Sequence, residues 1–133
     1  MAEKFVVKGD YEKALKEYEA ALKLFPKVTP GERTVFNMGL IWSHPDNPKR
    51  DCKKSAMYFQ QVLRDFPNSR LSKEAGIWAY MIDELISCES KSKTLEKSVD
   101  GLKKKITENQ RIVDTLKEID IGVEEKKRER LSR

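Results

Sequence analysis

The chain has 133 residues and carries 27 Lys and Arg against 22 Asp and Glu, which gives a formal net charge of +5. Apolar residues make up 38% of the sequence and charged residues 37%, a balance that favours a heavily solvated all-helical protein over a β-sandwich. No apolar run approaches the roughly 18 residues that a transmembrane helix needs, and the N-terminus lacks the apolar centre of a signal peptide.

The first predicted element is a helix over residues 10–25. Its apolar residues recur at spacings of three and four, which is the period of an amphipathic helix. Asp10 can accept a hydrogen bond from the amides of the first turn, and Pro26 prevents the helix from continuing. Residues 27–33 contain adjacent proline and glycine among polar neighbours, so we expect a turn there.

Three further helices follow in chain order. A helix over 34–43 is apolar on most sides and ends at the loop HPDNPKR, residues 44–50, which contains two prolines. The next helix covers 51–66 and is stopped by Pro67. Another begins after Ser69.

Residues 9–26 and 50–67 form an internal repeat with a constant offset of 41 residues. The superposition matches aspartates at the start, aromatic and leucine residues in the middle, and a Phe-Pro pair at the end: Asp10 with Asp51, Tyr18 with Phe59, Leu22 with Leu63, Phe25 with Phe66 and Pro26 with Pro67. A repeat of this size, built from two helices, is typical of a helical solenoid.

The string GDYEKALKEYEAALKLFP, residues 9–26, resembles the second helix of a tetratricopeptide repeat. The opening helix of the next repeat keeps the spacing in Val35, Met38, Gly39 and Trp42, with Gly39 as the small residue that permits close helix contact. Ala75, Trp78, Ala79 and Ile82 repeat that spacing. The resemblance implies an all-α fold with tetratricopeptide-like hairpins (an α-solenoid) over 1–87, the first repeat truncated and the third only an opening helix.

The same resemblance implies a peptide-binding groove on the face lined by the opening helices. The positions carried over by pattern are Arg33, Phe36, Asn37, Leu40, Lys73, Gly76 and Tyr80. The alternative is that these residues pack against the long C-terminal helix of the same chain.

From Trp78 onward, apolar residues follow alternating steps of three and four, which indicates the seam of a left-handed coiled coil. We predict a coiled-coil helix over 88–133 with a frayed basic end beyond Gly122. The polar stretch 88–94 leaves two alternatives, a continuous helix or one with a kink, frayed turn or hinge there. Asn109 is a polar seam position that can fix register. We favour self-association over pairing with another protein or folding back on the repeats. The predicted interface is formed by Leu95, Val99, Leu102, Ile106, Val113 and Leu116.

Charge and reactive residues narrow the function classes. Residues 91–133 hold 13 basic and 9 acidic side chains, but the basic runs are interrupted by glutamates and lack interleaved aromatic residues, so nucleic-acid binding is the weaker interpretation.

His44 could be grouped with Asp46 and Asp51 as metal ligands, but a helix-ending loop explains these three residues better. Cys52 and Cys88 are expected as free thiols packed like small apolar groups. We therefore predict no catalytic residue, no metal and no cofactor.

The sequence predicts a non-catalytic protein-protein interaction scaffold, which binds a peptide or protein partner and is a homo-oligomer through its C-terminal helix. The alternative is a cytoplasmic regulatory adaptor whose basic helix contacts nucleic acid. The whole-chain pattern resembles bacterial tetratricopeptide lipoproteins of the cell envelope, which implies a periplasmic or outer-membrane setting in envelope assembly or signalling. Because the first repeat starts midway, we expect a piece of a longer, lipid-anchored parent.

Overall fold

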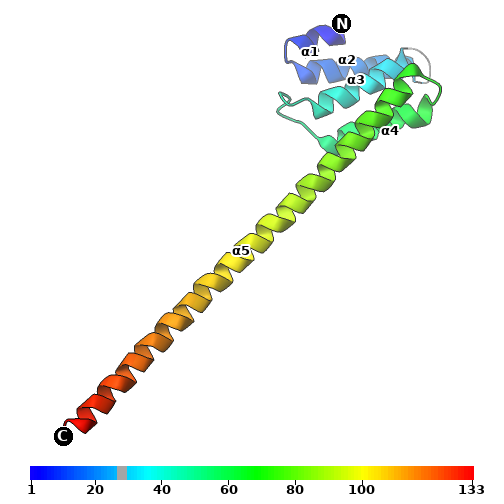
Figure 1. Ribbon diagram of the computed structural model, residues 1–133. Coiled ribbons are helices and arrows are strands. Elements are labelled where there is room, and N and C mark those ends of the chain that lie inside the picture. The colour runs from blue at the N-terminus through cyan, green and yellow to red at the C-terminus, as the bar shows by residue number, and fades with distance from the viewer. Residues whose placement is uncertain (27–29) are drawn as a thin grey trace. The chain divides into compact units, whose positions relative to one another are not determined.

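The computed structural model describes residues 1–26 and 30–133. The expected all-α fold with a long C-terminal helix is confirmed (Figure 1). The chain divides into two compact units, an N-terminal unit Met1–Glu89 and a C-terminal unit Ser90–Arg133. The helices in the described ranges are α1 Ala2–Val7, α2 Tyr11–Leu24, α3 Gly31–Ser43, α4 Cys52–Asp65 and α5 Arg70–Leu131.

Helices α2 and α4 have matching ends, as the 41-residue repeat predicts. Each has 14 residues. The Asp10 carboxylate accepts a hydrogen bond from the Lys13 amide at 3.3 Å, and the Asp51 carboxylate accepts one from the Lys54 amide at 3.1 Å. At the other ends, the amides of the C-caps donate to the carbonyl four residues earlier, and each helix is followed by proline. Both copies of the repeat therefore start and stop by the same local chemistry.

Helix α3 begins earlier than the sequence predicts. The helix starts at Gly31 rather than Thr34, and the Thr34 hydroxyl and amide both donate to the Pro30 carbonyl at 3.0 Å. A Cβ at Gly31 would lie 2.3 Å from the Phe25 carbonyl oxygen. The glycine is thus required by close backbone approach and not by a turn. Residues 27–29 of the predicted turn lie outside the described residues.

Helix α3 contributes to two apolar clusters within the N-terminal unit. Met38 and Ile41 pack with buried residues of α1 and α2, including Tyr11, Leu15 and Tyr18. Val35 and Phe36 pack with α4 and with the first turns of α5. The second cluster contains Ala56, Phe59, Val62, Phe66, Ala75, Ala79 and Ile82.

Helices α3 and α4 approach each other closely at Gly39 and Phe59. A Cβ on Gly39 would lie 3.0 Å from the Phe59 ring, which is fully buried. Phe59 meets Phe36 edge to face at 5.3 Å and stacks on Trp78 at 6.0 Å between ring centroids. Ser55, also fully buried, donates its hydroxyl to the Gly39 carbonyl at 2.7 Å. The predicted role of Gly39 in close helix contact is confirmed.

Helix α5 runs from Arg70 to Leu131, so the frayed end predicted beyond Gly122 is wrong. Within the polar stretch, the Thr94 hydroxyl donates to the carbonyl four residues earlier, at 3.1 Å, which satisfies the side chain without opening the helix. The last turns are rich in Glu, Lys and Arg, which are strong helix formers. Local propensity therefore maintains the helix where the apolar pattern weakens.

The Gly39–Phe59 contact predicts a difference between two glycine substitutions. Gly39→Ala pushes a methyl group into the Phe59 ring, whereas a Cβ at Gly76 would meet only the Leu63 side chain at an ordinary 3.7 Å. Both gain the same helix propensity, so urea unfolding should show Gly39→Ala to be less stable than Gly76→Ala by about 1–3 kcal/mol. Equal free energies of unfolding would contradict the close contact.

Candidate docking surfaces

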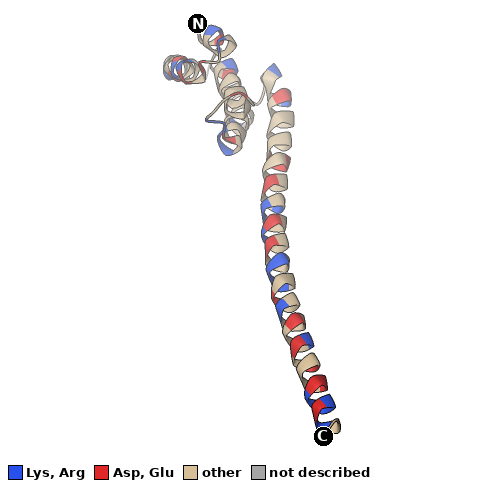
Figure 2. Ribbon diagram, turned by 90° about the vertical axis from the view of Figure 1, so that its left-hand side faces the viewer, with Lys and Arg blue, Asp and Glu red and all other residues tan. Residues whose placement is uncertain are grey.

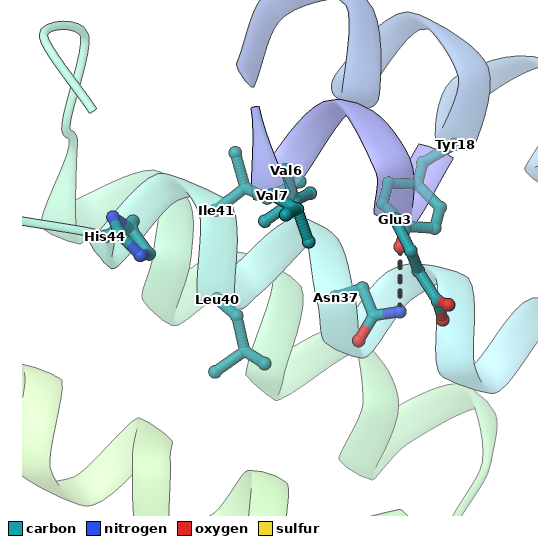
Figure 3. A pocket seen from close by; sticks show the side chains of 8 residues that line it. All are labelled: Glu3, Val6, Val7, Tyr18, Asn37, Leu40, Ile41 and His44. Carbon is teal, nitrogen blue, oxygen red and sulfur yellow. Dashed lines mark hydrogen bonds between the residues drawn. The ribbon is translucent and has the colours of Figure 1, made fainter. Parts of the chain in front are cut away.

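A cavity opens between α1, α2 and α3 in the N-terminal unit. Its volume is about 280 Å³, and Figure 3 shows its lining side chains. The lining is mainly apolar, with polar groups at its edges. It consists of Glu3, Val6, Val7, Tyr18, Asn37, Leu40, Ile41 and His44.

A second cavity of about 530 Å³ adjoins the first, because Leu40 and His44 line both. It is formed by the C-terminal end of α3, the following loop and the first turns of α5. Its other lining residues are Ser43, Pro45, Arg50, Trp78, Met81, Ile82 and Leu85. We call the two cavities together the α3 groove. The groove offers apolar side chains from three helices and one cation, Arg50, at its edge.

Hydrogen bonds hold the polar side chains of the α3 groove in place. The Asn37 amide donates to the Tyr18 hydroxyl at 3.0 Å (Figure 3). Burial raises the pKa of Tyr18, an effect that the Asn37 hydrogen bond opposes. His44 Nδ1 lies 3.2 Å from the Asp46 amide and 3.0 Å from the Tyr11 hydroxyl. Because the amide can only donate, Nδ1 is the acceptor in that contact.

The sequence-predicted groove residues are only partly brought together. Asn37 and Leu40 line the α3 groove. Phe36 lies in the core instead, 5% exposed against Phe59. The lining of the α3 groove does not include the exposed Arg33, Lys73 and Tyr80 or the half-buried Gly76.

The reason for the mismatch on α5 is its rotation about its own axis. Ala75, Ala79 and Ile82 are buried against α4, which turns Met81 toward the groove and leaves Tyr80, one residue earlier, 68% exposed. Sequence reasoning missed several of the apolar lining residues. For α5 a signal was available, since the predicted seam starts at Trp78, which lines the groove. Val6 and Val7 belong to a helix too short to show a period.

The predicted seam residues of the C-terminal unit are all exposed on α5. Their exposed fractions run from 42% at Val113 to 66% at Ile106. Ile112 and Ile119, beside the seam, are 53% and 58% exposed and widen the apolar stripe. An isolated helix with such a stripe is marginally stable in water, so the stripe is a candidate interaction surface.

Charges of both signs alternate along α5 (Figure 2). Lys103, Lys104 and Lys105 are exposed, but acidic residues are interspersed along the rest of the C-terminal unit. This distribution is typical of a solvated helix.

The remaining candidate sites are unremarkable in geometry. Asp51 caps α4 and His44 binds Tyr11, and the described ranges contain no group of His, Cys, Asp and Glu that could hold a metal ion. Both cysteines are free; Cys52 is half-buried, but Cys88 is exposed, so the expectation that it is packed is wrong. None of the helices in 1–26 and 30–133 combines the length and hydrophobicity needed to span a bilayer.

No protein-family model, no curated protein and no solved structure matches this chain. Its function is therefore inferred from its own residues and their geometry.

The Tyr18–Asn37 hydrogen bond predicts a pH-dependent effect of removing one hydroxyl. Tyr18→Phe should lower the free energy of unfolding by about 1 kcal/mol at neutral pH, because the Asn37 amide loses its acceptor. Since the folded-state pKa of Tyr18 is raised, its stabilising contribution is present below the unfolded pKa of about 10 and is lost as pH rises through the folded value.

Urea unfolding between neutral pH and pH 11 checks this. The difference between wild type and Tyr18→Phe should narrow above about pH 10. Tyr80→Phe is the control, since Tyr80 is 68% exposed and the substitution should change the free energy of unfolding little. A constant difference for Tyr18→Phe would contradict the prediction.

Proposed function

We propose that this protein is a non-catalytic interaction scaffold, in which the α3 groove holds apolar side chains of a peptide or protein partner and the C-terminal unit joins copies of the chain. The observation that carries the proposal is that the two cavities share lining residues. Leu40 and His44 belong to both, so apolar side chains of α1, α3 and α5 line neighbouring cavities. Adjoining apolar cavities suit an extended or helical segment better than a small metabolite.

The tetratricopeptide architecture is the fold we propose for the N-terminal unit. It is supported by the matched caps of α2 and α4 and by the small-residue contact at Gly39. In that architecture α1, α3 and the start of α5 are the opening helices of successive repeats. Of the positions that the resemblance assigns to the peptide-binding face, Asn37 and Leu40 line the α3 groove.

We also propose a non-enzymatic role, because the polar groups at the groove are engaged in holding its walls. Tyr18 accepts from Asn37, and His44 accepts from Tyr11 and the Asp46 amide. A general base needs a free acceptor within reach of the reacting proton, and His44 Nδ1 is already occupied. These contacts favour a preformed binding surface.

A pair of methionine substitutions tests the groove. Met81 lines the groove and is 56% exposed, whereas Met57 is 66% exposed on α4 and lines none of the cavities described above. Peptides selected from a random-peptide library against the wild-type chain should carry apolar anchor residues. Met81→Glu should weaken their binding by at least about ten-fold, because burying a methionine contributes about 1.5–3 kcal/mol. Met57→Glu should leave binding unchanged.

Calorimetric titration of the selected peptides gives the two affinities, and circular dichroism checks that both variants fold. Added salt should barely alter the binding, whereas contacts to phosphate would weaken steeply. Equal loss in both variants, or no loss in either, would rule out the α3 groove as the docking surface.

For the cellular setting we propose the bacterial envelope, on the resemblance to envelope tetratricopeptide lipoproteins. Fractionation of cells that express the complete gene should then recover the protein with the outer membrane, in a form released by detergent. Recovery in the cytoplasmic fraction would contradict this setting.

A further inference from the structure

We propose that Leu95–Leu116 forms a parallel, in-register, two-stranded coiled coil with a second copy of this chain. This deepens the pairing role given above to the C-terminal unit and rests on it. The evidence is the chemistry of the exposed positions on α5, which selects both the number of strands and their direction.

The seam alternates two kinds of apolar residue. With Val99 at heptad position a, the a positions are β-branched and the apolar d positions are leucine. All of these side chains are exposed by 42% or more. In parallel coiled coils, β-branched residues at a with leucine at d favour two strands, because each side chain then fits the angle at which it enters the facing helix. The a set is Val99, Ile106 and Val113, and the d set is Leu95, Leu102 and Leu116.

Asn109 selects the direction and the register. It is the one polar residue at a seam position between Leu95 and Leu116, and it occupies position d. In a parallel in-register pair, each layer contains the same residue from both copies, so the two Asn109 amides face and can hydrogen-bond to one another. An antiparallel pair over the same segment would place Asn109 opposite Ile106 or Val99, where its amide has no partner.

The flanking charges agree with this register. In a parallel pair, position g of one helix lies beside position e of the next heptad of the other. Lys91 at g then meets Glu96 at e of the second copy, and no pair of like charges arises at the g and e positions from 91 to 117. Ile112, at position g and 53% exposed, would cover the edge of the seam.

The length of the segment is sufficient for a stable pair. Residues 95–116 extend about 33 Å at 1.5 Å per residue, or three heptads. The segment contains Gly101, which costs about 1 kcal/mol within a helix, but this glycine lies at an outward position with nothing within 4 Å of its absent side chain. The second copy supplies the packing that offsets this cost.

Disulfide trapping tests the direction. In the full chain carrying Cys52→Ala and Cys88→Ala, single cysteines are introduced as Ser92→Cys at a, Leu116→Cys at d, and Lys97→Cys at the outward position f. All three positions are exposed in the chain as described. Under mild oxidation, Ser92→Cys and Leu116→Cys should form covalent dimers at least about ten-fold faster than Lys97→Cys, because only seam positions bring Cα atoms within about 7 Å. Sedimentation should give the mass of a dimer.

The outcomes separate the inference from the proposed pairing role. A dimer by mass without cross-linking at Ser92→Cys and Leu116→Cys would overturn the parallel register while leaving self-association intact. A trimer or tetramer would overturn the two-stranded arrangement. A strict monomer at tens of micromolar would overturn both, although the α3 groove would be unaffected.

Asn109→Leu provides a second test that does not depend on cysteine geometry. Removing the buried amide should lower the dissociation constant by about ten-fold and allow masses other than the dimer to appear. Gln110→Leu, beside the seam at position e, is the matched control and should keep a single dimeric mass. An unchanged affinity and mass for Asn109→Leu would place Asn109 outside the interface and overturn the proposed register.

Discussion

The close packing of Phe59 against Gly39 is the contact on which the N-terminal unit depends. With only 3.0 Å between the ring and the place of a missing Cβ, α4 can approach α3 closely enough for Ser55 to reach the Gly39 carbonyl. The Phe59 ring then serves as a platform for Phe36 on one side and Trp78 on the other. Three helices are thereby fixed about one aromatic side chain, and protein interiors packed at this density resist sliding and rotation.

This packing also determines the surface that remains open. The aromatic stack and the small residues of α5 pack against α4. Elsewhere α3 is covered only in part by α1 and α5, and the α3 groove lies where this cover is incomplete. A preformed groove needs no rearrangement before it binds, so little conformational entropy is lost on docking.

Local chemistry in the sequence was sufficient to predict α2 and α4 with their caps, but not how the helices rotate about their axes. Asp10, Asp51 and the two Phe-Pro pairs act within one turn of the chain, so their roles are visible in sequence. The position of Tyr80 depends on Ala79 and Ile82 packing on a helix more than ten residues away, and no local rule specifies that packing. Gly31 was predicted to be a turn residue. The group that requires a glycine there is the Phe25 carbonyl, which comes close to Gly31 only in the folded chain.

The same distinction explains the seam. The alternating period can be read in the sequence from Trp78 onward, yet Trp78, Met81 and Leu85 line the groove, and the exposed apolar stripe from Leu95 onward lies outside it. One helix thus contributes first to the groove and then to the apolar stripe.

In the proposed parallel pair, both copies of the N-terminal unit are joined to the same end of the coil, so two grooves are tethered to one coiled coil. A partner with two docking segments would then bind the second groove intramolecularly, at an effective concentration set by the spacing between its segments. Weak individual grooves would suffice for tight binding of such a partner, whereas an antiparallel pair would attach the grooves to opposite ends and favour partners whose segments lie far apart.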